Sequence, residues 1–200
     1  MSPREPEEYG PSMSQPQRHY TLDDYFAVEE MSPVKHEYFQ GEIFAMAGAS
    51  FDHNRIASNV VAVLHTALRD TGCGAFGSDL RIATEGELYT YPDVSVICGA
   101  PVLVPDRPDT VRNPVLLVEV LSDATRDYDR GKKLDAYRLI PSLREVLLVE
   151  QTRVHVDVWR RRDDASWTSF TATDRDATLA LTAVPVALPL REVYRDVVAR

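Results

Sequence analysis

A single acidic residue interrupts the most apolar stretch of the chain, which runs from Val115 to Leu121 with the sequence VLLVEVL. A run of this kind is typical of a strand that is buried on both faces of a sheet. A carboxylate buried in such a strand is costly unless it is paired, metal-bound or protonated. The sequence therefore predicts that Glu119 has a specific partner inside a core that contains a sheet.

Two residues are the nearest candidates for that partner. Asp93 opens the strand-like run DVSVIC and lies 119 − 93 = 26 positions before Glu119, whereas Lys133 follows in the segment DRGKKL. Two carboxylates on neighbouring strands suit a hard cation such as Mg²⁺ or Mn²⁺. Such an ion can activate a water molecule for phosphodiester chemistry. We therefore predict that Asp93 and Glu119 are catalytic residues and metal ligands.

Lys133 is placed by the helical periodicity of its segment. Lys133, Ala136, Tyr137 and Ile140 recur at i, i+3, i+4 and i+7, so the lysine lies on the inward stripe of a helix. An inward lysine after a strand with an inward glutamate suggests that the two side chains meet. Lys133 would then orient the attacking water or stabilise the charge that develops on the phosphate.

Each of the three residues also has a simpler structural interpretation. Asp93 follows a proline and can be an ordinary first residue of a strand. Glu119 can form a buried ion pair with an arginine or lysine. If that partner is Lys133 and no metal binds, the domain is a scaffold, and removal of one partner should cost roughly 3–5 kcal/mol of stability.

The predicted elements indicate an α/β or α+β domain, in which a mixed sheet is flanked by helices and extra strands follow at the C-terminal end. The expected helices cover residues 21–31, 50–70, 123 or 125 to 140, and 191–199. The expected strands cover residues 36–39, 42–46, 78–84, 91–98, 115–121, 145–150 and 154–160, with short strands from residue 167 onward.

Length and charge limit the classes of protein. The 200 residues suit a single domain over 20–200, after a proline-containing tail over 1–19 that we expect to be disordered. A net charge of −9 argues against a protein that coats nucleic acid through bulk electrostatics, but it leaves a nuclease with bound metal open. No apolar stretch approaches the roughly 20 residues of a membrane span, and no secretory signal is evident. We therefore expect a cytoplasmic protein without a membrane partner.

The two cysteines stand apart in the sequence. Neither Cys73 nor Cys98 lies in a CxxC motif or a Cys/His cluster. We therefore predict two separate thiols, rather than a disulfide or a zinc site.

Several short motifs follow one another in a characteristic order. They are HEYFQGEI at 36–43, HN at 53–54, SDLR at 78–81, YPDVSV at 91–96, NPVLLVEVLS at 113–122, YDRGKKL at 128–134 and IPSL at 140–143. On these motifs, over about residues 22–160, the chain resembles the Uma-type family of restriction-endonuclease-like proteins in the PD-(D/E)XK nuclease superfamily.

The resemblance implies an αβββαβ nuclease core and a Mg²⁺- or Mn²⁺-dependent endonuclease that hydrolyses DNA. It makes Asp93 the motif aspartate, Glu119 the acid of the next strand and Lys133 the lysine. The simplest superfamily pattern places lysine two residues after the acid, where this chain has Leu121. That departure and the acidic net charge favour an alternative, a non-catalytic binding or regulatory module with a nuclease fold.

Four further residues lie within the matching motifs. Asp79 is a candidate supporting acid, and its alternative is a turn or an ion pair with Arg81. Glu37 and Glu42 match the family without an assigned role, and His53 in the first turn of a helix is expected to be structural.

A homodimer would suit the cutting of two DNA strands by two-fold symmetry.

Overall fold

The structure, a computed structural model, describes residues 19–197. The tail expected over residues 1–19 therefore lies, apart from His19, outside the described residues. None of the helices in the described range is long and apolar enough to cross a membrane.

A six-stranded mixed sheet forms the centre of the molecule, in the order β12-β11-β10-β9-β6-β3. β9 and β10 run parallel, and the other neighbouring strands are antiparallel. The fold class predicted from the sequence is confirmed. The bounds of these strands are β3 Cys73–Gly77, β6 Val94–Cys98, β9 Pro114–Leu121, β10 Glu145–Glu150, β11 Val156–Arg161 and β12 Trp167–Ala172.

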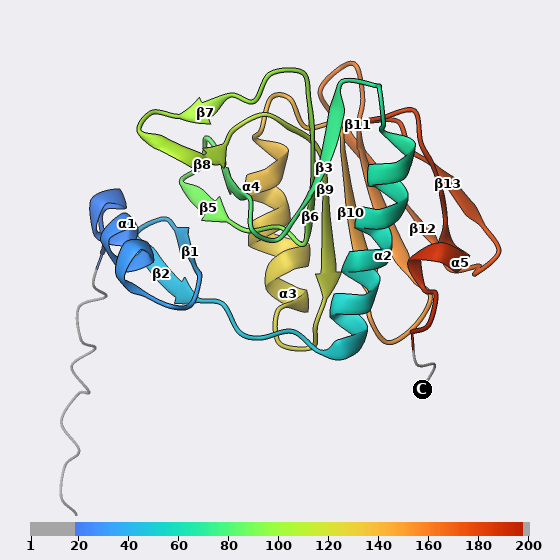
Figure 1. Ribbon diagram of the computed structural model, residues 1–200, viewed down its shortest axis with the longest axis horizontal. Coiled ribbons are helices and arrows are strands. Elements are labelled where there is room, and N and C mark those ends of the chain that lie inside the picture. The colour runs from blue at the N-terminus through green and yellow to red at the C-terminus, as the bar shows by residue number, and fades with distance from the viewer. Residues whose placement is uncertain (1–18, 198–200) are drawn as a thin grey trace, which may run out of the picture.

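Helices cover both faces of this sheet (Figure 1). The long helix α2 (Phe51–Ala67) packs on one face. The other face is covered by α3 (Arg126–Tyr128), the kinked segment η1 (Asp129–Lys133) and α4 (Leu134–Arg138).

The side chains of β9 alternate between these two layers. Val118 and Val120 join the core cluster that contains α2, whereas Leu117 and Leu121 join the cluster that contains α4. Because successive side chains of a strand point to opposite faces, Glu119 must project toward η1 and α4.

A second six-stranded sheet, in the order β2-β1-β5-β4-β8-β7, lies beside the first and packs against α1. The Gln40–Gly41 turn of its first hairpin has positive φ at both residues, 48° and 88°, which two-residue hairpins favour. The bounds are α1 Leu22–Met31, β1 His36–Phe39, β2 Glu42–Ala45, β4 Arg81–Ala83, β5 Leu88–Thr90, β7 Leu103–Val104 and β8 Arg107–Val111. The C-terminal part adds β13 Thr178–Ala180, β14 Ala187–Pro189 and the short helix α5 Leu190–Val193.

Three expectations about individual elements were wrong. The strand expected at 78–84 is replaced by β3 at Cys73–Gly77 in the central sheet and β4 at Arg81–Ala83 in the second sheet. The sequence of β3, CGAFG, is rich in glycine, which weakens a strand signal, and the strand is tolerated because it lies at the sheet edge. The polar segment 99–114, over which no strand was expected, forms the hairpin of β7 and β8, and the last helix, α5, is shorter than expected.

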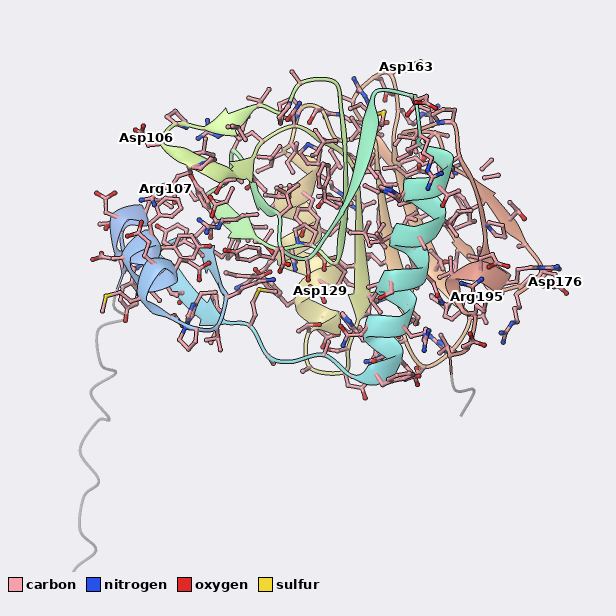
Figure 2. The ribbon with its side chains drawn as sticks, in the orientation of Figure 1. Asp106, Arg107, Asp129, Asp163, Asp176 and Arg195 are labelled. Carbon is pink, nitrogen blue, oxygen red and sulfur yellow. A yellow bond between two sulfur atoms is a disulfide. The ribbon has the colours of Figure 1, made fainter. Side chains whose placement is uncertain are left out.

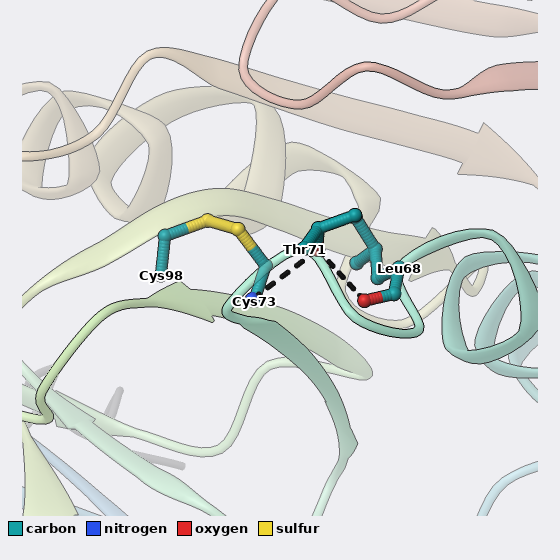
Figure 3. Close-up of a disulfide and its surroundings, with 4 residues drawn as sticks. All are labelled: Leu68, Thr71, Cys73 and Cys98. Atoms are coloured by element: carbon teal, nitrogen blue, oxygen red, sulfur yellow. Dashed lines mark hydrogen bonds between the residues drawn. A yellow bond between two sulfur atoms is a disulfide. The ribbon is translucent and has the colours of Figure 1, made fainter.

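The prediction of two separate thiols was also wrong. Cys73 and Cys98 form a disulfide, shown in Figure 3. They are directly opposite one another in the antiparallel pairing of β3 with β6, with their Cα atoms 4.0 Å apart. The disulfide thus depends on a strand that the sequence pattern did not predict.

Candidate functional site

Asp93 and Glu119 are brought to the same place by strand register. Val94 at the start of β6 pairs with Val118 of the antiparallel strand β9, so Asp93, directly before Val94, lies at the same end of this pairing as Glu119. The backbone of β9 also holds the aspartate, because the Val120 N–H donates to Asp93 Oδ2 over 2.7 Å. The two carboxylates predicted as metal ligands are therefore neighbours at one end of the central sheet.

Lys133 projects into a buried group of carboxylates. Its Nζ lies 2.9 Å from Glu37 Oε1, 3.0 Å from Glu119 Oε1 and 3.6 Å from Asp129 Oδ1. All four side chains are buried, and the Tyr137 hydroxyl donates a further hydrogen bond to Glu119 Oε1. The structure thus brings Glu119 and Lys133 into contact, as the helical spacing predicts.

Glu37 reaches this group from the other sheet. It lies on β1, next to Tyr38, which pairs with Tyr89 of β5. The Thr90 hydroxyl at the end of β5 donates to the Glu37 carboxylate and so anchors it. Residues from both sheets and from η1 therefore converge on one lysine.

The charges of this group are unbalanced, because three carboxylates surround one ammonium. Burial raises the pKa of Glu119 to about 8; Lys133 opposes this rise, and Asp129 and Asp93 add to it. Burial would lower the pKa of Lys133, but Glu119 and Glu37 hold it well above its ordinary value. Burial would raise the pKa of Glu37, but the charge and hydrogen bond of Lys133, with smaller contributions from other groups, lower it below its ordinary value. The lysine is thus charged, and the site tends to retain a proton on Glu119.

A kinked helical segment, η1, carries two members of the group. Asp129 and Lys133 occupy its two ends, and Figure 2 shows Asp129 in the middle of the molecule. Gly131 between them has a non-helical backbone conformation (φ −106°, ψ −106°), which places a kink in this segment. The segment is tied to the central sheet through Glu150 at the end of β10, which binds Arg126 and Arg130 at 3.0–3.1 Å.

His53 contacts Asp93 from α2, the helix on the face of the central sheet opposite to η1 and α4. Its Nε2 is 3.3 Å from Asp93 Oδ2, the same oxygen that accepts the Val120 N–H. Burial would lower the pKa of His53, but the hydrogen bond and charge of Asp93 raise it. His53 therefore contacts a predicted site residue directly, in addition to its place in the helix.

Asp79 is not part of this group. Its side chain is 96% exposed and pairs with Lys35, whereas Arg81 pairs with Glu29 and Asp109. Within residues 19–197 it makes no ion pair or hydrogen bond with Asp93, Glu119 or Lys133.

Sequence reasoning assigned no site role to Glu37, His53 or Asp129. Glu37 and His53 lie in the family-like motifs, so the resemblance already marked them. Asp129 lies four residues before Lys133, a spacing that places two side chains on one helical face. That spacing was the available signal for Asp129.

Comparisons with known proteins identify a family and two relatives of this chain. The model of the Uma2 family, described as "Putative restriction endonuclease", matches residues 22–191. An uncharacterized protein of Synechocystis sp. (strain ATCC 27184 / PCC 6803 / Kazusa), slr1290, is 36% identical over 178 residues, which cover 86% of this chain and 90% of the relative. A second uncharacterized protein of that organism, sll1609, is 38% identical over 148 residues, covering 74% of this chain and 84% of the relative.

A solved structure shares the fold. It is a crystal structure from Anabaena variabilis ATCC 29413, described as "a putative nuclease belonging to DUF820". The TM-score is 0.69 and the sequence identity 20%, and the match covers 87% of this chain and 97% of the other. At this identity the likeness shows that the two chains share a fold.

Proposed function

This chain belongs to the Uma2 family of restriction-endonuclease-like proteins, and from that membership and its site we propose that it is a metal-dependent endonuclease that hydrolyses DNA phosphodiester bonds. Asp93 and Glu119 would hold Mg²⁺ or Mn²⁺, and Lys133 would be the catalytic lysine. The observation that carries the proposal is the buried excess of carboxylates over lysine, with Asp93 at the end of β6 that lies beside Glu119.

The residues present fit a hard divalent cation. Carboxylate oxygens are its preferred ligands, and Mg²⁺ usually keeps several waters or takes substrate phosphate oxygens as well. Within residues 19–197 no cluster of three or more His, Cys, Asp or Glu side chains has metal-binding geometry. Asp93 and Glu119 would supply two carboxylate ligands of such an open site. The Asp93 side chain is 16% exposed, which gives the site access to solvent.

A divalent ion bound there would activate a water molecule and offset the charge that develops on the phosphate. The chain's own residues supply the surrounding charges. Lys133 is held at close range by Glu37 and Glu119, but its contact with Asp129 is longer than a hydrogen bond at 3.6 Å. One N–H of Lys133 is thus left to orient the attacking water or to donate to a phosphate oxygen.

The test is cleavage of plasmid DNA by the purified chain with Mg²⁺, with Mn²⁺ and with EDTA. We expect cleavage with either ion, none with EDTA, and loss of at least about 100-fold in rate for Asp93→Ala and Lys133→Met. Asp79→Ala is the matched acidic control and should cleave normally, because its side chain is exposed and pairs with Lys35. Cleavage that persists in Asp93→Ala, or a wild type inactive with both ions on single- and double-stranded DNA, would contradict the proposal.

A second candidate is a non-catalytic module that keeps the nuclease fold. It is favoured by Leu121 at the usual position of the lysine and by the two close ion pairs that engage Lys133. In that case a DNA binding measurement should give the same affinity for the wild type and for the double variant Glu119→Gln, Lys133→Met.

A further inference from the structure

The first turn of α2 is fixed against the end of the central sheet. Ser50, the N-cap residue, accepts the His53 N–H over 3.1 Å, and its hydroxyl donates to Gln151 Oε1 over 2.6 Å. Gln151 directly follows β10. The position of His53 is therefore set by the helix cap and by the sheet together.

The two oxygens of Asp93 have different surroundings. Oδ2 is contacted by the Val120 N–H at 2.7 Å and by His53 Nε2 at 3.3 Å. For Oδ1, no hydrogen bond is found within residues 19–197. Because a carboxylate oxygen only accepts, a hydrogen bond in this pair requires that His53 Nε2 carries the proton. The two donors thus occupy one oxygen and leave the other available.

The second ring nitrogen of His53 lowers the stability of the fold. Nδ1 is buried and has no hydrogen-bond partner in the described part of the chain. An unsatisfied buried polar atom costs free energy that an apolar ring of similar shape would avoid. Local inconsistencies of this kind are expected at functional sites. The contact of Nε2 with Asp93 is the compensating feature that the structure offers.

We propose that His53 is a positioning residue, whose Nε2–H and the Val120 N–H together fix Asp93 Oδ2 so that Oδ1 is presented to a divalent cation. This proposal rests on the proposed function, since it assigns the groups that orient one of its metal ligands. Hydrogen-bond partners of metal ligands typically change metal affinity by 10–100-fold when they are removed.

The experiment compares four variants of the full chain by Mn²⁺ titration, with free Mn²⁺ followed by electron paramagnetic resonance and folding checked by thermal melts. His53→Phe keeps a ring but has no donor. His53→Asn carries a donor too close to the backbone to reach Asp93, and His53→Gln carries one near the position of Nε2. His65→Asn is the matched control, because His65 is exposed on the same helix.

We expect His53→Phe and His53→Asn to raise the Mn²⁺ dissociation constant by about 10-fold or more. His53→Gln should stay within a few-fold of the wild type, and His65→Asn should be unchanged. If His53→Phe does not fold, the comparison of His53→Asn with His53→Gln still tests the positioning role. If all variants bind Mn²⁺ with equal affinity, or if His53→Gln binds it as weakly as His53→Asn, the positioning role is overturned but the metal site is not. A wild type that binds no Mn²⁺ would overturn both this role and the metal site.

Discussion

Glu37 and Glu119 share one lysine, whose Nζ lies 2.9 Å from the first carboxylate and 3.0 Å from the second. The two glutamates belong to different sheets, Glu37 to β1 and Glu119 to β9. The packing of the two sheets against one another thus depends on the charge state of a group that the proposed chemistry also uses. The stability of the protein should therefore respond to pH and to substitutions at this group.

Replacement of Glu119 should flatten the dependence of stability on pH. Burial, opposed by Lys133 and reinforced by Asp129 and Asp93, raises the pKa of Glu119 from its ordinary 4.5 to about 8. The protonated form is favoured by folding, so this stability is fully present below pH 4.5 and is lost as the pH rises through about 8. Glu119→Gln lacks the titrating group and should lack this decline.

Thermal melts in EDTA at pH 5 and pH 8 measure the effect. A pKa difference of even one unit corresponds to about 1.4 kcal/mol, and 1 kcal/mol to about 2–4 °C in a domain of this size. The melting temperature of the wild type should thus fall by at least about 3 °C more than that of Glu119→Gln between the two pH values. Parallel declines would show that Glu119 titrates normally in the folded protein.

Removal of Lys133 should leave buried carboxylates without a counter-charge. Lys133→Met should lower the free energy of unfolding at pH 8 by roughly 3–5 kcal/mol, measured by urea denaturation. The loss should shrink at pH 5, because burial raises the pKa of Glu119 to about 8 and this carboxylate then binds a proton. Burial also raises the pKa of Asp129, which acts in the same direction. Lys132→Met is the control at the exposed neighbouring position and should change stability by no more than about 0.5 kcal/mol. A Lys133 variant as stable as this control would refute the expectation.

The residues that local patterns could place are those on regular elements. The apolar run around Glu119 is typical of the fully buried strand β9, and the i, i+3, i+4, i+7 spacing correctly put Lys133 on the inward face of its helical segment. Together these patterns predicted the contact between the two side chains. Neither pattern needs information from distant parts of the chain.

The parts that could not be predicted depend on how distant elements dock. Glu37 reaches Lys133 because a hairpin of the second sheet packs beside the helical layer, and no local period reports such docking. The disulfide depends on the register of β3 with β6, and β3 is an edge strand whose glycines weaken its signal. Asp93 meets His53 only after α2 is laid across the sheet.

Loss of the disulfide should lower stability without affecting the site. Cys73 and Cys98 close a loop with a sequence separation of 25, and a crosslink of that length contributes about 2–4 kcal/mol by restricting the unfolded chain. The crosslink joins the end of β6 opposite to Asp93. The double variant Cys73→Ala, Cys98→Ala should therefore unfold at lower urea concentration, yet keep the Mn²⁺ affinity of the wild type. A double variant as stable as the oxidised wild type would contradict this.

Loss of the Glu150 carboxylate should loosen the kinked segment η1. Glu150 is buried, with 3% of its side chain exposed, and it binds Arg126 of α3 and Arg130 of η1. Hydrogen bonds to charged groups contribute roughly 1.5–3 kcal/mol each, but both arginines are partly exposed and can turn to water. We therefore expect Glu150→Gln to cost about 1–3 kcal/mol in urea denaturation and, because η1 holds Asp129 and Lys133, to slow DNA cleavage as well.

The control for this variant is Asp135→Asn. Asp135 forms an exposed pair with Arg138 on the next helix, α4, and such a pair contributes little, at most about 1 kcal/mol. It should leave both stability and cleavage nearly unchanged. If Glu150→Gln lowers stability but cleaves DNA at the wild-type rate, the network around Glu150 supports the fold alone, and the position of Lys133 does not depend on it.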